Sequence, residues 1–411
     1  MKNTNQSNDA MNAAVKRETS RESGMALLVA VAVASVVVFM LVTSYSLIET
    51  SSRSIAGQLK RNGQAANVAQ AGLTDALAWF QRQNTQPVTT FAPALNLAAS
   101  PPINDTEVAS IGIVRTYPVS QLGNVWARYE VRRTNTTDVS LSRGKPGAGT
   151  IWSFESDGIL FRDANGDKAL NFTDTNGNGV YDRGEPGEVL AMSKERVDIQ
   201  RLSLVLPGGN AAIQGTSCSG ISTTSGTNAA RVLGSNAGIG IACKGGTGTP
   251  STSGTTVTGA PATQTGVNPF DPSFNAVFGV SQSELIGLAS IVVPDAASLP
   301  DPIPSMSLIV IQGNATFTVA DPLVGSGILV VLGNLTIPAG STSSFSGVIY
   351  VTGTYSQGAP SLVRGAVVGQ STIRLIGAGD VAEVDWDSRI VQQVRNTLGG
   401  YRFARTEYVV P

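Results

Sequence analysis

The N-terminal end of the chain changes abruptly from polar to apolar residues. From Met25 to Val42 only Ser35 is not apolar, and no charged residue follows until Glu49. A segment of this kind can cross a hydrocarbon core of about 30 Å as a helix. Basic residues lie before it, which places the N-terminus on the cytoplasmic side of a membrane. The alternatives are a buried core helix, a cleaved secretory signal peptide and a simple single-span anchor.

Beyond this apolar segment, hydrophobic residues recur at steps of three, four and seven positions. They form one apolar stripe of a helix, made of Ile48, Ile55, Leu59, Ala66, Leu73, Leu77 and Phe80. No proline interrupts the chain between Met25 and Pro87. The pattern therefore predicts one continuous helix over residues 25–85, with an apolar half followed by an amphipathic half.

Alternating apolar and polar positions then predict short strands. The clearest are in Val108–Tyr117, Val125–Arg133 and Ile151–Leu160. Strands of this length would form a small sheet packed beside the amphipathic half of the helix. The predicted fold class is therefore α+β, with a long N-terminal helix and a small β-rich head.

The C-terminal part contains a repeat of 20 residues. Similar apolar runs begin at Ser307, Gly327 and Gly347, each run ends at a glycine, and a shortened copy occupies residues 365–369. A period near 20 with short strands is typical of a solenoid, here a parallel β-helix. An antiparallel sandwich is the alternative. A short amphipathic helix over 388–398 and a closing strand over 401–410 are predicted after the repeat.

Residues 206–270, between the strands and the repeat, are rich in Gly, Ser and Thr. They contain both cysteines of the chain, Cys218 and Cys243, and an even count in an exported segment is compatible with one disulfide. The expectation is an irregular, disulfide-linked insertion with a flexible loop over 247–266, and a disordered linker is the alternative. The chain then divides into a leader (1–24), a helix (25–85), an α+β head (86–205), an insertion (206–270) and a solenoid with a closing segment (271–411).

A calcium-binding loop is the clearest chemical motif. The twelve positions from Asp174 to Glu185 follow the pattern in which short oxygen-bearing side chains alternate around a glycine turn. The expected ligands are Asp174, Asn176, Asn178, the carbonyl of Val180, Asp182 and Glu185. A second, less complete loop lies just upstream, with Lys168 in place of the glycine, and its candidate ligands are Asp163, Asn165, Asp167 and Asn171. The alternative is a cluster of turns that binds no metal.

The amino-acid composition excludes several classes of function. The chain of 411 residues has 28 Lys and Arg, 29 Asp and Glu, and no His. The absence of His excludes mechanisms that need a histidine base or a histidine metal ligand. Nearly balanced charge offers no basic surface for nucleic acid. Some parallel β-helices are polysaccharide lyases or hydrolases, but the repeats here are almost free of charge, so we expect no enzyme activity.

The residues around the start of the apolar segment resemble the signal of type IV prepilins: Arg21-Glu22-Ser23-Gly24-Met25-Ala26-Leu27-Leu28-Val29. The resemblance implies that prepilin peptidase cuts between Gly24 and Met25 and methylates the new N-terminus. The segment Ala69-Gln70-Ala71-Gly72-Leu73 is similar to the outer helix of PilX-like minor pilins, and Asp385-Trp386-Asp387-Ser388 to their C-terminal region.

One position departs from the pattern of major pilins. They carry Glu at the fifth mature position, and here that position is Val29. PilX-like minor pilins and K-type pseudopilins of type II secretion also lack this Glu. A subunit without it cannot neutralise its neighbour's N-terminal amine inside the bilayer, which suits a tip or initiating subunit.

The resemblance implies a minor pilin or pseudopilin as the function. Its partners would be other pilin subunits, bound through the N-terminal helix, and prepilin peptidase. It would lie in the inner membrane as a precursor and later in a pilus or pseudopilus. The alternative function is a membrane-anchored surface adhesin with a β-solenoid head.

Overall fold

The computed structural model describes Ser35, 38–40, Thr43, Tyr45, 55–119, 124–138, 150–224, 230–252, 254–377 and 379–407. Two compact units, 1–65 and 66–411, make up the chain. In the first unit the described residues are helical. Gly24, Met25 and Val29, which carry the predicted processing signal, lie outside the described residues.

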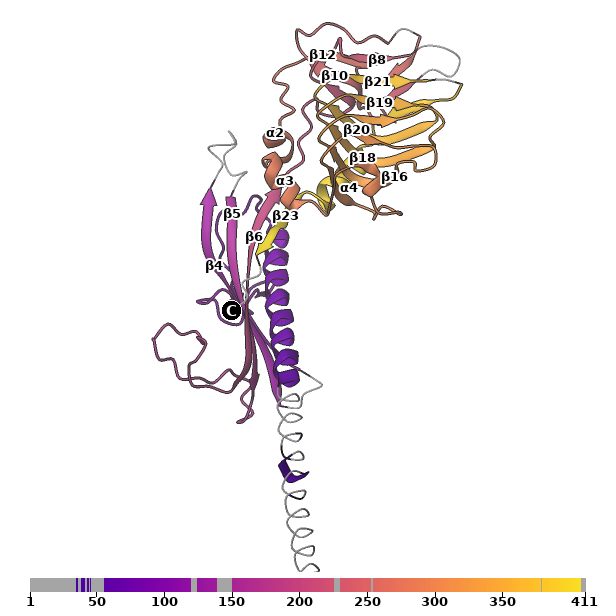
Figure 1. Cartoon of the computed structure of the whole chain (residues 1–411). Helices are drawn as coiled ribbons and strands as arrows, with labels where there is room; N and C mark the ends of the chain where they lie inside the picture. The colour runs from indigo at the N-terminus through magenta and orange to yellow at the C-terminus, as the bar shows by residue number, and fades with distance from the viewer. Residues whose placement is uncertain are drawn as a thin grey trace, which may run out of the picture. The chain divides into compact units, whose positions relative to one another are not determined.

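The helical residues 66–82 of the second unit pack against a sheet. Positions at steps of three and four are buried, including Ala69, Leu73, Ala76 and Phe80. At Gly72 an added Cβ would lie 2.6 Å from Ser156 Oγ and 2.9 Å from Val131 Cγ2, so only glycine allows this close approach. The amphipathic pattern of this stretch therefore reflects burial against strands (Figure 1).

Five antiparallel strands form this sheet, in the order β23-β6-β5-β4-β3. Their bounds are β3 Ile113–Pro118, β4 Val125–Asp138, β5 Thr150–Arg162, β6 Val189–Leu202 and β23 Gly400–Glu407. Phe80 packs between Trp152 and Phe154 of β5, with ring centroids 5.3 and 5.7 Å away. A separate hairpin, β1 Leu95–Asn96 and β2 Ile103–Asn104, lies in the segment that joins the helix to β3. The predicted small sheet beside the helix is thus present.

The 20-residue repeats stack as parallel strands. In one ladder Ser307 pairs with Gly327, Gly327 with Gly347, and Gly347 with Gly365. The strands of this ladder are β13 Ile291–Val293, β14 Ser307–Ile311, β16 Val324–Val331, β18 Ser343–Val351, β20 Ser361–Gly369 and β22 Ala382–Asp385. A second parallel ladder holds β15 Ala315–Thr316, β17 Leu335–Ile337, β19 Tyr355–Gly358 and β21 Ile373–Ile376. The register predicted from the repeat is confirmed, and it excludes the antiparallel sandwich.

Asparagine side chains at the turns and glycines within the strands keep the repeats in register. Asn314 Oδ1 accepts a hydrogen bond from Asn334 N, and Asn334 Oδ1 accepts one from Thr354 N, both at 2.8 Å. At Gly347, with φ +152°, an added Cβ would collide with the carbonyl oxygen of Gly327 in the repeat beside it. Ser307 has no residue paired beneath it, because β13 pairs with β14 only from Ile309 onward. The first repeat can therefore carry a side chain where the later ones need glycine.

The Gly, Ser and Thr-rich segment is not an irregular insertion. It forms further parallel strands of the solenoid: β7 Ala211–Gly215, β8 Ile221–Thr223, β9 Arg231–Leu233, β10 Ile239–Lys244, β11 Thr256–Thr258 and β12 Thr263–Val267. These strands stack on the last repeats, because β7 pairs with β20, β8 with β21 and β9 with β22. The predicted flexible loop over 247–266 is likewise wrong where β11 and β12 occupy it.

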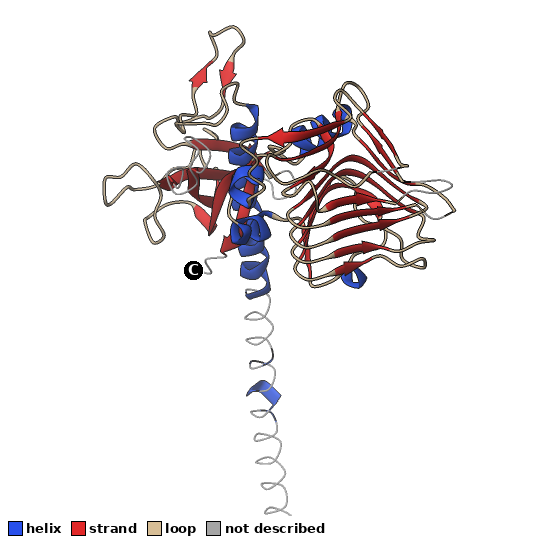
Figure 2. Ribbon diagram, turned by 90° about the horizontal axis from the view of Figure 1, so that it is seen from above, coloured by secondary structure: helices blue, strands red, loops and turns tan. Residues whose placement is uncertain are grey.

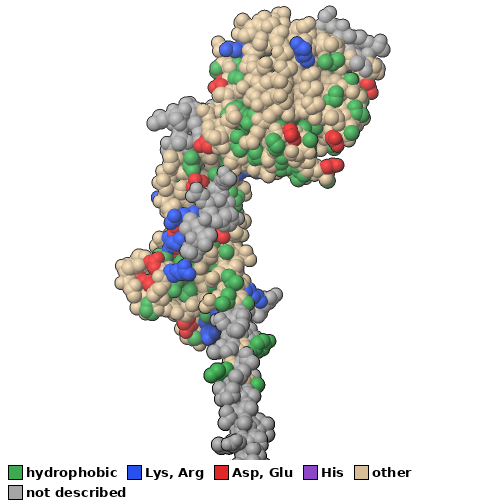
Figure 3. Space-filling view, in the orientation of Figure 1, with side chains coloured by type: hydrophobic (Ala, Val, Ile, Leu, Met, Phe, Trp, Pro, Cys, Tyr) green, Lys and Arg blue, Asp and Glu red, His purple; other side chains and the backbone are tan. Residues whose placement is uncertain are grey.

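The second unit also contains three short helices: α2 Phe274–Phe278, α3 Gln282–Leu288 and α4 Ser388–Thr397. Helices α2 and α4 pack on the longer ladder, whereas α3 packs mainly against β23 of the antiparallel sheet. Phe274 and Phe278 pack on Tyr350 of β18, with ring centroids 5.0 and 5.2 Å away. The strands are buried on both faces as a result, as their continuous apolar sequences require. Elsewhere the solenoid is poor in charge, and residues 245–363 contain no Lys or Arg (Figure 3).

The solenoid is inserted between two neighbouring strands of the antiparallel sheet. The chain leaves the sheet at Leu202 in β6 and returns at Gly400 in β23, and these two residues are paired. Figure 2 shows both groups of strands. The sheet is therefore completed only after the solenoid has been made, and the predicted closing strand becomes its edge strand.

The predicted fold class needs correction. The chain is mostly β, because residues 206–270 add strands that the sequence did not reveal. The long continuous helix predicted over residues 25–85, with a membrane-spanning apolar half, is also wrong as a description of the fold. Within the residues that the structure describes, no helix is both long and apolar enough to span a bilayer. The continuous helical stretch at this end covers residues 55–82 and is amphipathic.

Candidate functional site

Two consecutive loops join β5 to β6, and the downstream loop has the hydrogen bonds of a cation-binding turn. Asp174 accepts from the N–H groups of Gly177 (2.6 Å) and Gly179 (2.7 Å). Asn176 Oδ1 accepts from Asn178 N, and Asn178 Oδ1 from Val180 N. The side chains at positions 1, 3 and 5 thus fold the backbone around one centre, as short Asx residues do.

The upstream loop repeats this pattern bond for bond. Asp163 accepts from Gly166 N and Lys168 N, Asn165 Oδ1 from Asp167 N, and Asp167 Oδ1 from Ala169 N. Lys168 has φ +62°, close to the +75° of Gly179 at the equivalent position. Lys168 therefore adopts the left-handed turn that Gly179 adopts in the downstream loop, although it stands in place of the expected glycine.

The closing carboxylate matches the sequence prediction in the downstream loop and differs from it in the upstream loop. Glu185 accepts from Thr175 N and Asp182 N, both at 2.8 Å, and so closes the downstream loop. In the upstream loop the equivalent N–H, that of Ala164, donates to Glu188 Oε2 at 3.2 Å. Counting twelve positions from Asp163 puts Asp174 at that place, but Asp174 is the first residue of the downstream loop. Glu188 was missed because it lies far outside the twelve-residue spacing.

Aromatic packing fixes both loops to the sheet. Phe172 lies between them and contacts Tyr181 edge to face, with ring centroids 5.6 Å apart. Tyr181 packs with Ile159 and Phe161 of β5 in a small core. A bridge between Phe172 and Gly187 ties the start of the downstream loop to its end. The loops are therefore held on a rigid support.

The carboxylates of the loops are held in their charged form. The backbone N–H of Gly179 lowers the pKa of Asp174, and the N–H groups of Asp182 and Thr175 lower the pKa of Glu185. Amide donors from Asn176 and Asn178 lower the pKa of Asp182. Three anionic groups and several amide oxygens on one loop are the donors that calcium prefers.

The donor types fit calcium, but the ligands are not gathered. Asn176 and Asn178 both donate their side-chain N–H₂ to Asp182 Oδ2 at 2.7 Å. Asn171 donates to Asp167 rather than offering its oxygen. Among the described residues, no group of three or more acidic or sulfur side chains lies close enough to hold a metal ion.

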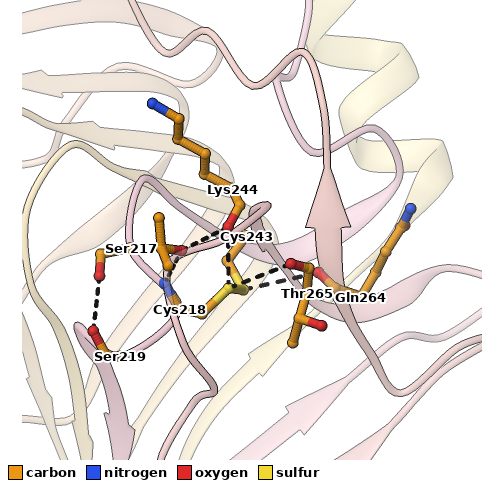
Figure 4. Close-up of a disulfide and its surroundings, with 8 residues drawn as sticks. Ser217, Cys218, Ser219, Cys243, Lys244, Gln264 and Thr265 are labelled. Atoms are coloured by element: carbon orange, nitrogen blue, oxygen red, sulfur yellow. Dashed lines mark hydrogen bonds between the residues drawn. A yellow bond between two sulfur atoms is a disulfide. The ribbon is translucent and has the colours of Figure 1, made fainter.

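The two cysteines are joined in a disulfide, as the sequence led us to expect. Cys218 precedes β8 and Cys243 lies in β10, and both are fully buried in the solenoid core. Figure 4 shows the disulfide between Cys218 and Cys243. Cys218 N donates to Thr247 Oγ1 at 2.9 Å, and that hydroxyl donates to Lys244 O at 2.6 Å. The bond links two layers of the segment that was taken for an insertion.

Comparison with known proteins does not show a family for this chain. No protein-family model matches the sequence, and no curated protein matches it. One solved structure has a distant likeness, the competence-associated pilin ComZ from Thermus thermophilus. The match covers 84% of this chain and 97% of that chain, with 10% identity and a TM-score of 0.18. A likeness at this TM-score carries no argument about this chain.

Proposed function

We propose that the protein is a processed filament subunit of the type IV pilin class, either a minor pilin or a pseudopilin. The observation that carries the proposal is in the sequence: a polar leader with basic residues ends at Gly24, directly before an apolar segment. This segment holds the precursor in the inner membrane. Prepilin peptidase then cuts after Gly24, and other pilin subunits bind through the N-terminal segment.

Two features support a position at the end of a filament rather than along it. Val29 supplies no carboxylate to a neighbour's N-terminal amine. The head also carries a solenoid of about 200 residues, inserted between Leu202 and Gly400, and a bulky insertion of this kind obstructs a repeated contact between identical subunits. Few copies per filament are therefore expected.

The copy number can be tested in sheared filaments. Quantitative mass spectrometry of the filament fraction should find this chain at a small fraction of the main subunit. Val29→Glu should leave the membrane level unchanged and alter the amount in filaments, and Val38→Glu is a matched control elsewhere in the apolar segment. A wild-type level equal to that of the main subunit would contradict the end position.

We further propose that calcium binds the paired loops and orders this part of the head. Asp174, Asn176, Asn178, Val180, Asp182 and Glu185 would hold one ion. Asp163, Asn165 and Asp167, closed by Glu188, would hold a second, with Asn171 beside it. Affinity in the range typical of extracellular modules, about 10⁻⁴–10⁻³ M, is expected.

A membrane-anchored adhesin is the second candidate, favoured by the large solenoid surface that is poor in charge. An adhesin of this kind would keep residues 1–24, whereas a pilin-like subunit loses them. We propose no catalytic activity.

A further inference from the structure

A cleft of about 990 Å³ lies where the solenoid joins the antiparallel sheet. Its walls come from the helical residues 77–81, the end of β6 with the link that follows it, the end of α3, the end of α4, and β23. This volume is at the upper end of the range for pockets that bind small molecules. The loops of the candidate cation site contribute no residue to it.

The cleft is lined by three arginines and by no acidic residue. They are Arg201 of β6, Arg395 of α4 and Arg402 of β23. Each guanidinium has five N–H donors. Arg395 uses Nε for Leu204 O at 3.1 Å, and Arg402 donates to Ser290 Oγ at 2.9 Å and Leu398 O at 3.4 Å. Most of the N–H donors of the three guanidinium groups therefore have no hydrogen-bond partner within the described part of the chain.

The positive charge of this cleft has no counter-charge within the described part of the chain. None of the three arginines forms an ion pair there. Burial lowers the pKa of Arg395 and of Arg402, and no carboxylate opposes that effect. The partners that these two do have are neutral oxygens, namely the carbonyls of Leu204 and Leu398 and the hydroxyl of Ser290, which cannot compensate a full charge.

Arg201 is the least satisfied of the three arginines, because its side chain forms no hydrogen bond within the described part of the chain. Its Nε is buried and has no hydrogen-bond partner. A buried donor without an acceptor is costly, and the cost is larger for a charged group. Glu284 of α3 lies outside the cleft lining and is held by Ser281 and Gln200 instead.

The rest of the lining is apolar or amidic. Leu77, Leu204 and Leu288 form apolar walls, and Gln81 and Gln86 add neutral polar groups. We propose that this cleft binds an organic anion, in which a carboxylate or phosphate group meets the arginines and a compact apolar body meets the leucines. Planar guanidinium groups match both anions through paired hydrogen bonds. The proposal does not depend on the filament role, so either can fail alone.

Calorimetric titration of the purified full chain tests it, with benzoate, phenyl phosphate and benzamide as probes. Benzamide has the shape of benzoate without its charge. Benzoate or phenyl phosphate should bind saturably at one site per chain and at least about tenfold more tightly than benzamide, because a hydrogen bond to a charged group is worth that much. Which anion binds more tightly identifies the head group of the natural ligand.

Arg201→Gln should weaken the anion at least about tenfold. Arg231→Gln is the matched control, because Arg231 is half exposed on the solenoid and lies outside the cleft. If Arg201→Gln fails to fold, Arg395→Gln replaces it. Binding of neither anion, equal binding of benzamide, or unchanged binding in the arginine variants that fold would each overturn the proposal.

Discussion

Gly347→Ala should destabilise the solenoid far more than an ordinary glycine substitution. The residue has φ +152°, a conformation used almost only by glycine, and forcing alanine into it costs about 1–3 kcal/mol. The new Cβ would also collide with the Gly327 carbonyl oxygen and lie 2.9 Å from the carbon and nitrogen of the same residue. Relieving that collision separates two paired strands and loses one or two ladder hydrogen bonds, about 1 kcal/mol each. The expected loss is roughly 2–5 kcal/mol of unfolding free energy.

Two control variants separate the backbone strain from the collision with the neighbouring repeat. Gly340 also has a positive φ, +83°, but its nearest neighbour for an added Cβ is Val319 Cγ2 at 3.5 Å, an ordinary contact. Gly340→Ala should therefore cost only about 1–2 kcal/mol of backbone strain. Gly287 in α3 has no atom within 4 Å of the added Cβ, and Gly287→Ala should stabilise by up to about 1 kcal/mol.

The assay is urea denaturation followed by the fluorescence of tryptophan, since Trp386 is buried in the solenoid core. The order of midpoints should be Gly287→Ala, wild type, Gly340→Ala and then Gly347→Ala. Equal midpoints for Gly340→Ala and Gly347→Ala would refute the argument, because the close approach of neighbouring repeats would then carry no energetic weight.

Three further predictions concern the disulfide, the loops and pH. Replacing both Cys218 and Cys243 by Ser should cost about 3 kcal/mol in the same urea assay, because the bond restricts the unfolded chain; free thiols in alkylated, non-reduced native protein would contradict the pairing. Millimolar calcium should raise the melting temperature of the full chain, and Asp174→Ala combined with Glu185→Ala should remove most of that rise; an unchanged response would place the site elsewhere. Burial acts to raise the pKa of Glu155, but hydrogen bonds from its basic neighbours outweigh it and lower that pKa. The stability that ionised Glu155 contributes should be complete above its unfolded pKa of about 4.3 and be lost as the pH falls through its lower folded pKa. The difference in unfolding free energy between wild type and Glu155→Gln should therefore shrink under acid conditions. A difference that grows would contradict the lowered pKa.

The sequence predicted the parts of the fold that repeat regularly. Steps of 20 residues bring Gly327, Gly347 and Gly365 into register, and parallel pairing follows directly. Residues 211–267 escaped because their paired positions are unevenly spaced: Ile213 is followed by Ile241 and then by Thr263. Their partners in the repeats also lie about 150 residues away in the chain, and no local pattern shows such pairing.

The sequence also predicted part of the candidate cation site. Spacing alone located the Asx residues of both loops, since each bonds to backbone only a few positions ahead. Glu188 was missed because it reaches Ala164 through the pairing of β5 with β6, which brings the two ends of the segment together. The three arginines of the cleft come from β6, α4 and β23, so only the folded chain reveals them.

The mass of the mature chain shows whether the precursor is cut after Gly24, as the pilin-like role requires. The protein should be isolated from membranes of cells that express the full precursor and measured intact, together with its N-terminal peptide. We expect a chain that begins at Met25 with a methylated N-terminus, and a precursor that remains uncut in Gly24→Leu while Gly63→Leu is processed normally. A mature wild-type chain that still begins at Met1 would contradict it and favour the anchored adhesin.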